Sequence, residues 1–214
     1  MQIRHLLMIF IPAFVLIFLV LFIRIIQYEP LNPAIEAIDA SSKTDTSVIP
    51  LFPEDPIVGD KKALTSLVLF ADFGCDQCKN EYLLFQQMLI EYGAKVKIIW
   101  KGLPVTKFPY DSELSHVYAF CANKQKKFAT FTDIVFENNF ALSEENLKDI
   151  AVSSELDIDS LETCLQSSEP REYIEKNKQI ARLLNIQSVP TMFLNNKQIS
   201  NPQTLDEWKT LLSL

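Results

Sequence analysis

The chain has 214 residues, enough for one ordinary domain with appended segments. Its formal net charge is −7, with 20 Lys and Arg against 27 Asp and Glu. Binding to nucleic acid requires clustered basic side chains, so this acidic balance excludes nucleic acid from the expected partners.

The first predicted element is a transmembrane helix within residues 1–26. The run Leu6–Ile23 is apolar and is interrupted only by Pro12, and about 20 such residues cross a bilayer. A cleaved signal peptide is the alternative, but its apolar region is shorter and ends in small residues. Arg4 precedes the run, whereas acidic residues follow Arg24. The positive-inside rule therefore favours a cytoplasmic N-terminus and a single-pass protein whose remaining chain lies outside the cytoplasm.

Residues 27–56 are predicted to form an extended tether. This segment holds five prolines and a polar run rich in Ser and Thr, a composition typical of extended linkers. The folded domain is expected to occupy residues 57–214.

The folded domain is predicted to begin with a strand, a helix and a second strand. Residues 67–72 are apolar enough for a central strand, and residues 76–92 carry apolar side chains at helical spacing. Gly93 is expected to end this helix in a left-handed conformation. Residues 95–100 then predict a second strand, which would complete a βαβ unit.

Helical patterns dominate the next part of the chain. They cover residues 111–122, 128–137, 144–153, a short segment that opens near Asp159 and contains Cys164, and residues 170–184. Ser143 is expected to cap the third of these helices, and Asp159 with Glu162 resembles a capping box that opens the fourth. Pro170 suits the first turn of the fifth.

The C-terminal part predicts a hairpin followed by a helix. Residues 191–194 and 197–200 read as strands, and Asn195-Asn196 between them suits a tight turn because Asn tolerates positive φ. Residues 202–214 carry apolar side chains on one helical face.

Cys75 and Cys78 mark the candidate active site, at the junction of the first strand and helix. Unpaired N–H groups and the helix dipole stabilise a thiolate at this position, and the thiolate is the reactive form. Two intervening residues place Cys78 one turn along the same face. Cys75 is therefore expected to attack, and Cys78 to resolve the mixed disulfide.

Zinc and copper are the alternatives for this cysteine pair. A structural zinc site needs four nitrogen or sulfur ligands, usually as two close pairs. Cys121 and Cys164 lie far apart in the sequence, and the histidines are His5 and His116. We therefore expect no metal and no other cofactor.

Val189-Pro190 precedes a predicted strand and follows a helix. One interpretation is a proline that donates no hydrogen bond at the edge of a sheet. The other is a cis peptide bond between these residues, held by the fold.

These features together resemble the DsbA-like branch of the thioredoxin superfamily, from about Asp55 to the C-terminus. The resemblance rests on the C-x-x-C at a strand–helix junction, the helical block and the segment SVPTMFLNNK. It implies an α/β, thioredoxin-like fold with residues 111–184 as an inserted helical subdomain. It also implies that Cys75 attacks, that Cys78 resolves, and that the Val189–Pro190 loop binds an extended substrate segment.

The chain departs from this family beside the cysteines. Leu69 stands six positions before Cys75, where thioredoxins and DsbA carry a buried acid, and Asp76-Gln77 separates the cysteines. Asp76 disfavours a neighbouring thiolate and also suits the first turn of a helix, whereas Lys79 favours the thiolate. A less stabilised thiolate makes a weaker oxidant, so the protein is expected to be less oxidising than DsbA.

The remaining cysteines are expected to form a structural disulfide, Cys121–Cys164, as some relatives of this family do. Two free buried thiols or a second redox pair are the alternatives. A structural bridge requires an oxidising compartment, in agreement with the expected orientation. His116 is assigned to packing, and Asp72 is assigned no role.

The sequence thus predicts a membrane-tethered, extracytoplasmic thiol–disulfide oxidoreductase, and an oxidase in particular. Its expected partners are exported proteins with thiols or disulfides, and a membrane redox partner that resets the cysteine pair. A disulfide reductase or isomerase, and a non-catalytic module that binds client proteins, are the alternatives.

Overall fold

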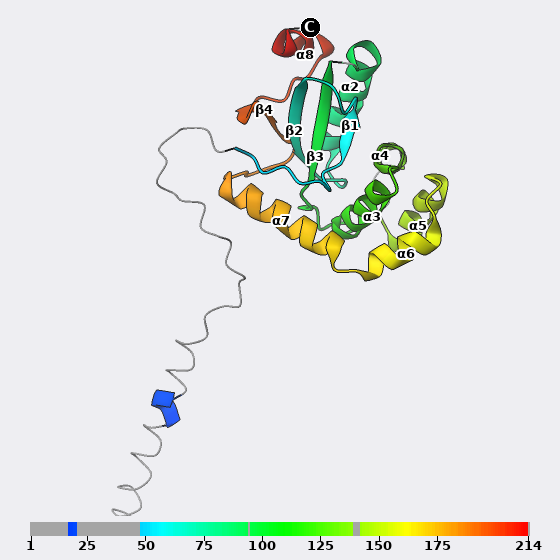
Figure 1. Ribbon diagram of the computed structural model, residues 1–214, viewed down its shortest axis with the longest axis vertical. Coiled ribbons are helices and arrows are strands. Elements are labelled where there is room, and N and C mark those ends of the chain that lie inside the picture. Colours follow the sequence, from blue (N-terminus) through cyan, green and yellow to red (C-terminus); the bar gives the residue numbers. More distant parts are fainter. Residues whose placement is uncertain (1–16, 21–47, 94, 139–141, 214) are drawn as a thin grey trace, which may run out of the picture. The chain divides into compact units, whose positions relative to one another are not determined.

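The computed structural model describes residues 17–20, 48–93, 95–138 and 142–213 (Figure 1). Residues 17–20 are helical. The rest of the predicted membrane segment, and the tether up to residue 47, lie outside the described residues. Within the described ranges, no helix combines the length and the apolar character needed to cross a membrane.

A five-stranded sheet forms the centre of the domain. The strands are β1 Ile57–Gly59, β2 Thr65–Ala71, β3 Val96–Gly102, β4 Thr191–Leu194 and β5 Lys197–Ile199, in the spatial order β1-β3-β2-β4-β5. β2 and β3 are parallel and the other pairs are antiparallel. Helix α2, Asp76–Tyr92, connects β2 to β3 and confirms the predicted βαβ unit. Sequence reasoning missed β1, whose three residues are too few to show a period.

Five helices separate β3 from β4, and one follows β5. They are α3 Glu113–Lys124, α4 Phe128–Glu137, α5 Glu144–Ser153, α6 Ile158–Gln166, α7 Glu169–Leu183 and α8 Leu205–Leu212. Figure 1 shows α3 to α6 grouped beside the sheet, with α7 returning the chain toward it. The predicted helices are therefore present, with ends displaced by a few residues.

Two predicted helix ends are wrong in detail, and two other local predictions are confirmed. Asp157, and not Asp159, caps α6, because its carboxylate accepts a hydrogen bond from the N–H of Ser160 at 2.8 Å. The backbone of Gly93, expected to be left-handed, has instead a right-handed helical conformation, with φ −57°. Ser143 does cap α5, through a bond from the N–H of Asn146. The turn residues Asn195 and Asn196 have positive φ, 52° and 62°.

Side chains alternate between two cores along β2. Leu67 and Leu69 face the larger core with α2 and the helical block, whereas Val68 and Phe70 face a smaller core with residues of α7. Ile49, from the predicted tether, is buried in the smaller core. Its N–H donates to Asn196 Oδ1 at 3.1 Å, so residues before β1 also pack on the domain.

A charged pair is buried in the domain as well. Lys101 on β3 is fully buried, and its Nζ lies 2.7 Å from Asp55 Oδ2. The hydroxyl of Tyr173 also donates to Asp55, at 2.8 Å. This network connects β3, α7 and the segment before β1.

Candidate active site

Cys75 is the N-cap of α2, directly after the loop that leaves β2. Its φ of −109° is extended, which turns its side chain over the first turn of the helix. The N–H of Cys78 donates to Cys75 Sγ at 3.2 Å. Both residues are free thiols; Cys75 is half-buried and Cys78 is fully buried. The sequence-predicted cysteine pair is thus in the predicted place.

The two thiols have opposite pKa shifts. A hydrogen bond from the Cys78 thiol lowers the pKa of Cys75; burial opposes this, and the N–H groups of Cys78 and Gln77 add to it. Burial raises the pKa of Cys78 well above its ordinary value, and the neighbouring Cys75 raises it further. Cys75 can therefore ionise and react with a sulfur at its exposed side, while Cys78 stays protonated.

The peptide bond Val189–Pro190 is cis, which confirms the second interpretation of this dipeptide. The thiol of Cys75 donates to the carbonyl oxygen of Val189 at 3.7 Å. The loop before β4 is therefore in contact with the reactive sulfur, although 114 residues separate the two in sequence.

Asp72 and His116 also belong to the site, and sequence reasoning missed both. The N–H of Asp72 donates to Cys78 Sγ at 3.4 Å. The Asp72 carboxylate lies 3.1 Å from His116 Nε2, and it accepts from the N–H groups of Val105 at 2.9 Å and Thr106 at 2.7 Å. Asp72 thus fixes the loop after β3 against the loop that carries Cys75.

The Asp72 carboxyl is ionised in this environment. Burial raises its pKa, but the hydrogen bond and the charge of His116, with bonds from Ser112 and Thr106, outweigh burial and hold the pKa below its usual range. Its negative charge in turn raises the pKa of Cys75 and of Cys78. The buried acid that acts on the two thiols is therefore Asp72. Leu69, which stands six positions before Cys75, is an apolar core residue.

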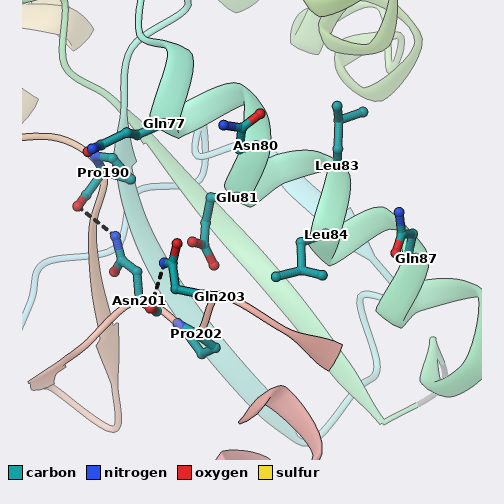
Figure 2. Close-up of a pocket in the computed structure, with 10 residues that line it drawn as sticks. All are labelled: Gln77, Asn80, Glu81, Leu83, Leu84, Gln87, Pro190, Asn201, Pro202 and Gln203. Carbon is teal, nitrogen blue, oxygen red and sulfur yellow. Dashed lines mark hydrogen bonds between the residues drawn. The ribbon is translucent and has the colours of Figure 1, made fainter. Parts of the chain in front are cut away.

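The residues predicted to tune the pair lie around it. Asp76 is exposed in the first turn of α2, and Gln77 is exposed beside Pro190 (Figure 2). Lys79 is half-buried, and its N–H donates to the carbonyl oxygen of Cys75 at 3.1 Å. Of these, Gln77 acts on Cys75 through its backbone N–H.

Cys121 on α3 and Cys164 on α6 form a disulfide. The S–S distance is 2.07 Å and the Cα atoms are 5.8 Å apart. The bridge connects two helices of the helical block, so it is separate from the Cys75–Cys78 pair.

Comparison with known proteins places the folded domain in a family. A family model described as Thioredoxin matches residues 52–213. The chain is 26% identical over 158 residues to the probable disulfide bond formation protein D of Bacillus cereus, covering 68% of this chain and 71% of that protein. It is 23% identical over 181 residues to the Na(+)/H(+) antiporter NhaA 3 of Salinispora tropica, covering 84% of this chain. The chain spans only 28% of the length of that antiporter.

Solved structures share the fold. The structure of oxidised BdbD from Bacillus subtilis superimposes with a TM-score of 0.64 at 24% identity, over 78% of this chain and 96% of that one. The fold, the family match and the cysteine pair agree. The chain belongs to the thioredoxin family.

Proposed function

We propose that this protein is a membrane-tethered, extracytoplasmic oxidoreductase that exchanges disulfides with exported proteins through Cys75 and Cys78. One observation carries the proposal: a half-exposed thiol of lowered pKa lies at a helix N-terminus, between a buried thiol and the Val189 carbonyl. The Val189–Pro190 loop offers backbone groups to a substrate segment that brings its own sulfur to Cys75.

In the oxidising direction, a substrate thiolate attacks Cys75 Sγ of the Cys75–Cys78 disulfide. The disulfide breaks, a mixed disulfide forms on Cys75, and Cys78 leaves as a thiolate that takes up a proton. A second substrate thiolate then attacks the substrate sulfur of the mixed disulfide and releases the Cys75 thiolate. The substrate loses two electrons and gains a disulfide, and the cysteine pair gains the two electrons. A membrane redox partner would remove them.

Trapping of the mixed disulfide tests this exchange. Without Cys78 the complex on Cys75 cannot be resolved from within, so Cys78→Ser in the full chain should accumulate partner adducts that dithiothreitol releases. Cys75→Ser is the matched control and should trap nothing. A non-catalytic module would give no adducts with either variant, and a Cys75–Cys78 bridge that resists mild reductant would support that alternative.

We propose that the net direction of exchange is oxidation of the substrate, and that the Cys75–Cys78 disulfide is a weaker oxidant than the disulfide of DsbA. The negative charge of Asp72 opposes the lowering of the pKa of Cys75. A less stabilised thiolate makes the reduced pair less stable, so the disulfide is a weaker oxidant. Equilibration of the full chain with glutathione buffers tests this. A potential between about −120 and −180 mV supports an oxidase or isomerase, whereas about −230 mV or below indicates a reductase.

The apolar run near the N-terminus and the Cys121–Cys164 bridge support the tethered, extracytoplasmic location, since such bridges persist in oxidising compartments. A membrane-impermeant maleimide added to intact cells should label reduced Cys75. Labelling only after lysis would overturn this location.

A further inference from the structure

A polar cavity of about 350 Å³ lies beside Pro190 (Figure 2). One wall is the face of α2 that follows the cysteines, and the other is Pro190 with residues 201–203. Asn201 Nδ2 donates to the carbonyl oxygen of Pro190 at 2.9 Å, and Gln203 Nε2 donates to that of Asn201 at 2.9 Å. These bonds fix the second wall to the loop that contacts Cys75, so a segment bound along Pro190 passes the cavity.

Glu81 faces this cavity from α2 and is 4% exposed (Figure 2). Its Oε1 has no hydrogen-bond partner among the described residues. Burial raises the pKa of Glu81 to about 7, and the charge of Glu207 on α8 adds to the shift. A buried carboxylate without a partner is unfavourable, and a cation brought into the cavity would remove that cost.

The lining residues select among possible occupants. Of those that the structure describes, Glu81 is the one charged side chain; the others are amides, leucines and prolines. An acidic side chain would be repelled, and an apolar one would leave the carboxylate unpaired. A lysine or arginine can place its charged group on Glu81, and the carbonyl oxygens of side chains such as Asn80 and Gln203 can accept its remaining N–H groups.

We propose that this cavity binds a lysine or arginine side chain of the exchanging protein, so that substrates with a basic residue near the reacting cysteine are preferred. The inference rests on the proposed function and adds a specificity-determining residue, Glu81, to it. Glu81 acts by positioning the substrate segment against Cys75 and takes no part in the sulfur chemistry.

Exchange rates with matched peptides test this preference. The reduced full chain is mixed with peptides of one sequence, each carrying its cysteine as a mixed disulfide with a chromophoric thiol. Lys, norleucine or Glu replaces each of the three residues on either side of that cysteine in turn. At one of these positions the Lys peptide should react about tenfold faster than the norleucine peptide, as a charge-assisted hydrogen bond predicts. Glu81→Gln should bring the ratio near one.

Two controls keep the test independent of the variant's folding. Glu91→Gln removes a carboxylate from the exposed end of α2, outside the cavity lining, and should preserve the preference. In the unmodified chain, raising the salt concentration should reduce the ratio. Equal rates for all peptides, or a Lys preference that persists in Glu81→Gln, would overturn the inference and leave the proposed function intact. If no peptide reacts at all, the proposed function itself fails.

Discussion

Replacement of Glu81 by glutamine should change how the stability of the domain depends on pH. The pKa of Glu81 is about 7 in the folded chain, against 4.5 for an ordinary glutamate. Between these pH values the folded state binds more protons than the unfolded state. The contribution of Glu81 to the unfolding free energy is therefore complete below the unfolded pKa and is lost as the pH rises through the folded pKa. Glutamine does not titrate and removes this loss.

The size of the effect follows from the two pKa values. The interval between 4.5 and about 7, at about 1.4 kcal/mol per pKa unit, corresponds to about 3 kcal/mol. The unfolding free energy of Glu81→Gln minus that of the unmodified chain should therefore increase by about 3 kcal/mol between about pH 4 and pH 8.

Urea unfolding of the full chain at half-unit pH intervals measures this difference. Glu91→Gln, with its carboxylate exposed on the same helix, serves as the matched control. Parallel stability curves for Glu81→Gln and the unmodified chain would refute the reasoning. They would mean that the carboxylate of Glu81 is solvated or paired in the folded chain. The cavity would then contain no unpaired carboxylate to bind a basic side chain.

Three further predictions concern groups that hold the domain together. Replacing both Cys121 and Cys164 by alanine should lower the unfolding free energy by about 4 kcal/mol, since the bridge closes a loop with a sequence separation of 43, while peptide exchange continues; loss of exchange would place the bridge in the redox chemistry. Asp72→Asn should cost about 2 kcal/mol near pH 7, because its ionised form accepts several hydrogen bonds. Since the folded pKa of Asp72 is depressed, the difference in unfolding free energy between the variant and the unmodified chain should narrow as the pH falls below about 4. A difference that does not depend on pH would contradict this. Lys101→Met should lower the unfolding free energy, measured in urea, by about 3 kcal/mol, because Asp55 is left buried without its cation. A second replacement, Asp55→Leu, should recover part of this loss. No recovery would argue against a stabilising role for the Lys101–Asp55 ion pair.

Local patterns predicted most of the secondary structure. Helix α2 begins at Asp76 and ends at Tyr92 as predicted, because its apolar spacing is a local signal, although Gly93 is not left-handed. The three-residue strand β1 carries no such signal, and the cap of α6 was assigned two residues too late because Asp157 and Asp159 are equally suited to that role. Local periodicity thus identifies elements better than it identifies their ends.

Contacts between distant segments account for what was missed at the site. Asp72 and His116 are 44 residues apart, and only the packing of α3 against the loop after β2 brings them together. Glu81 has the sequence context of an exposed helical residue, yet α2 packs against α8 and the segment before it, and this contact buries it. The cysteine pair, by contrast, is defined within one turn of one helix, so its spacing was sufficient.

The pH dependence of Cys75 alkylation tests the central claim most directly. The reduced full chain is treated with iodoacetamide over a range of pH, and the modified cysteine is identified by mass spectrometry. We expect Cys75 alone to react, with a midpoint clearly below that of an ordinary thiol, about 8.5, while Cys78 stays unmodified. A midpoint at or above the ordinary value, or equal reaction of the two cysteines, would contradict the assignment of Cys75 as the nucleophile.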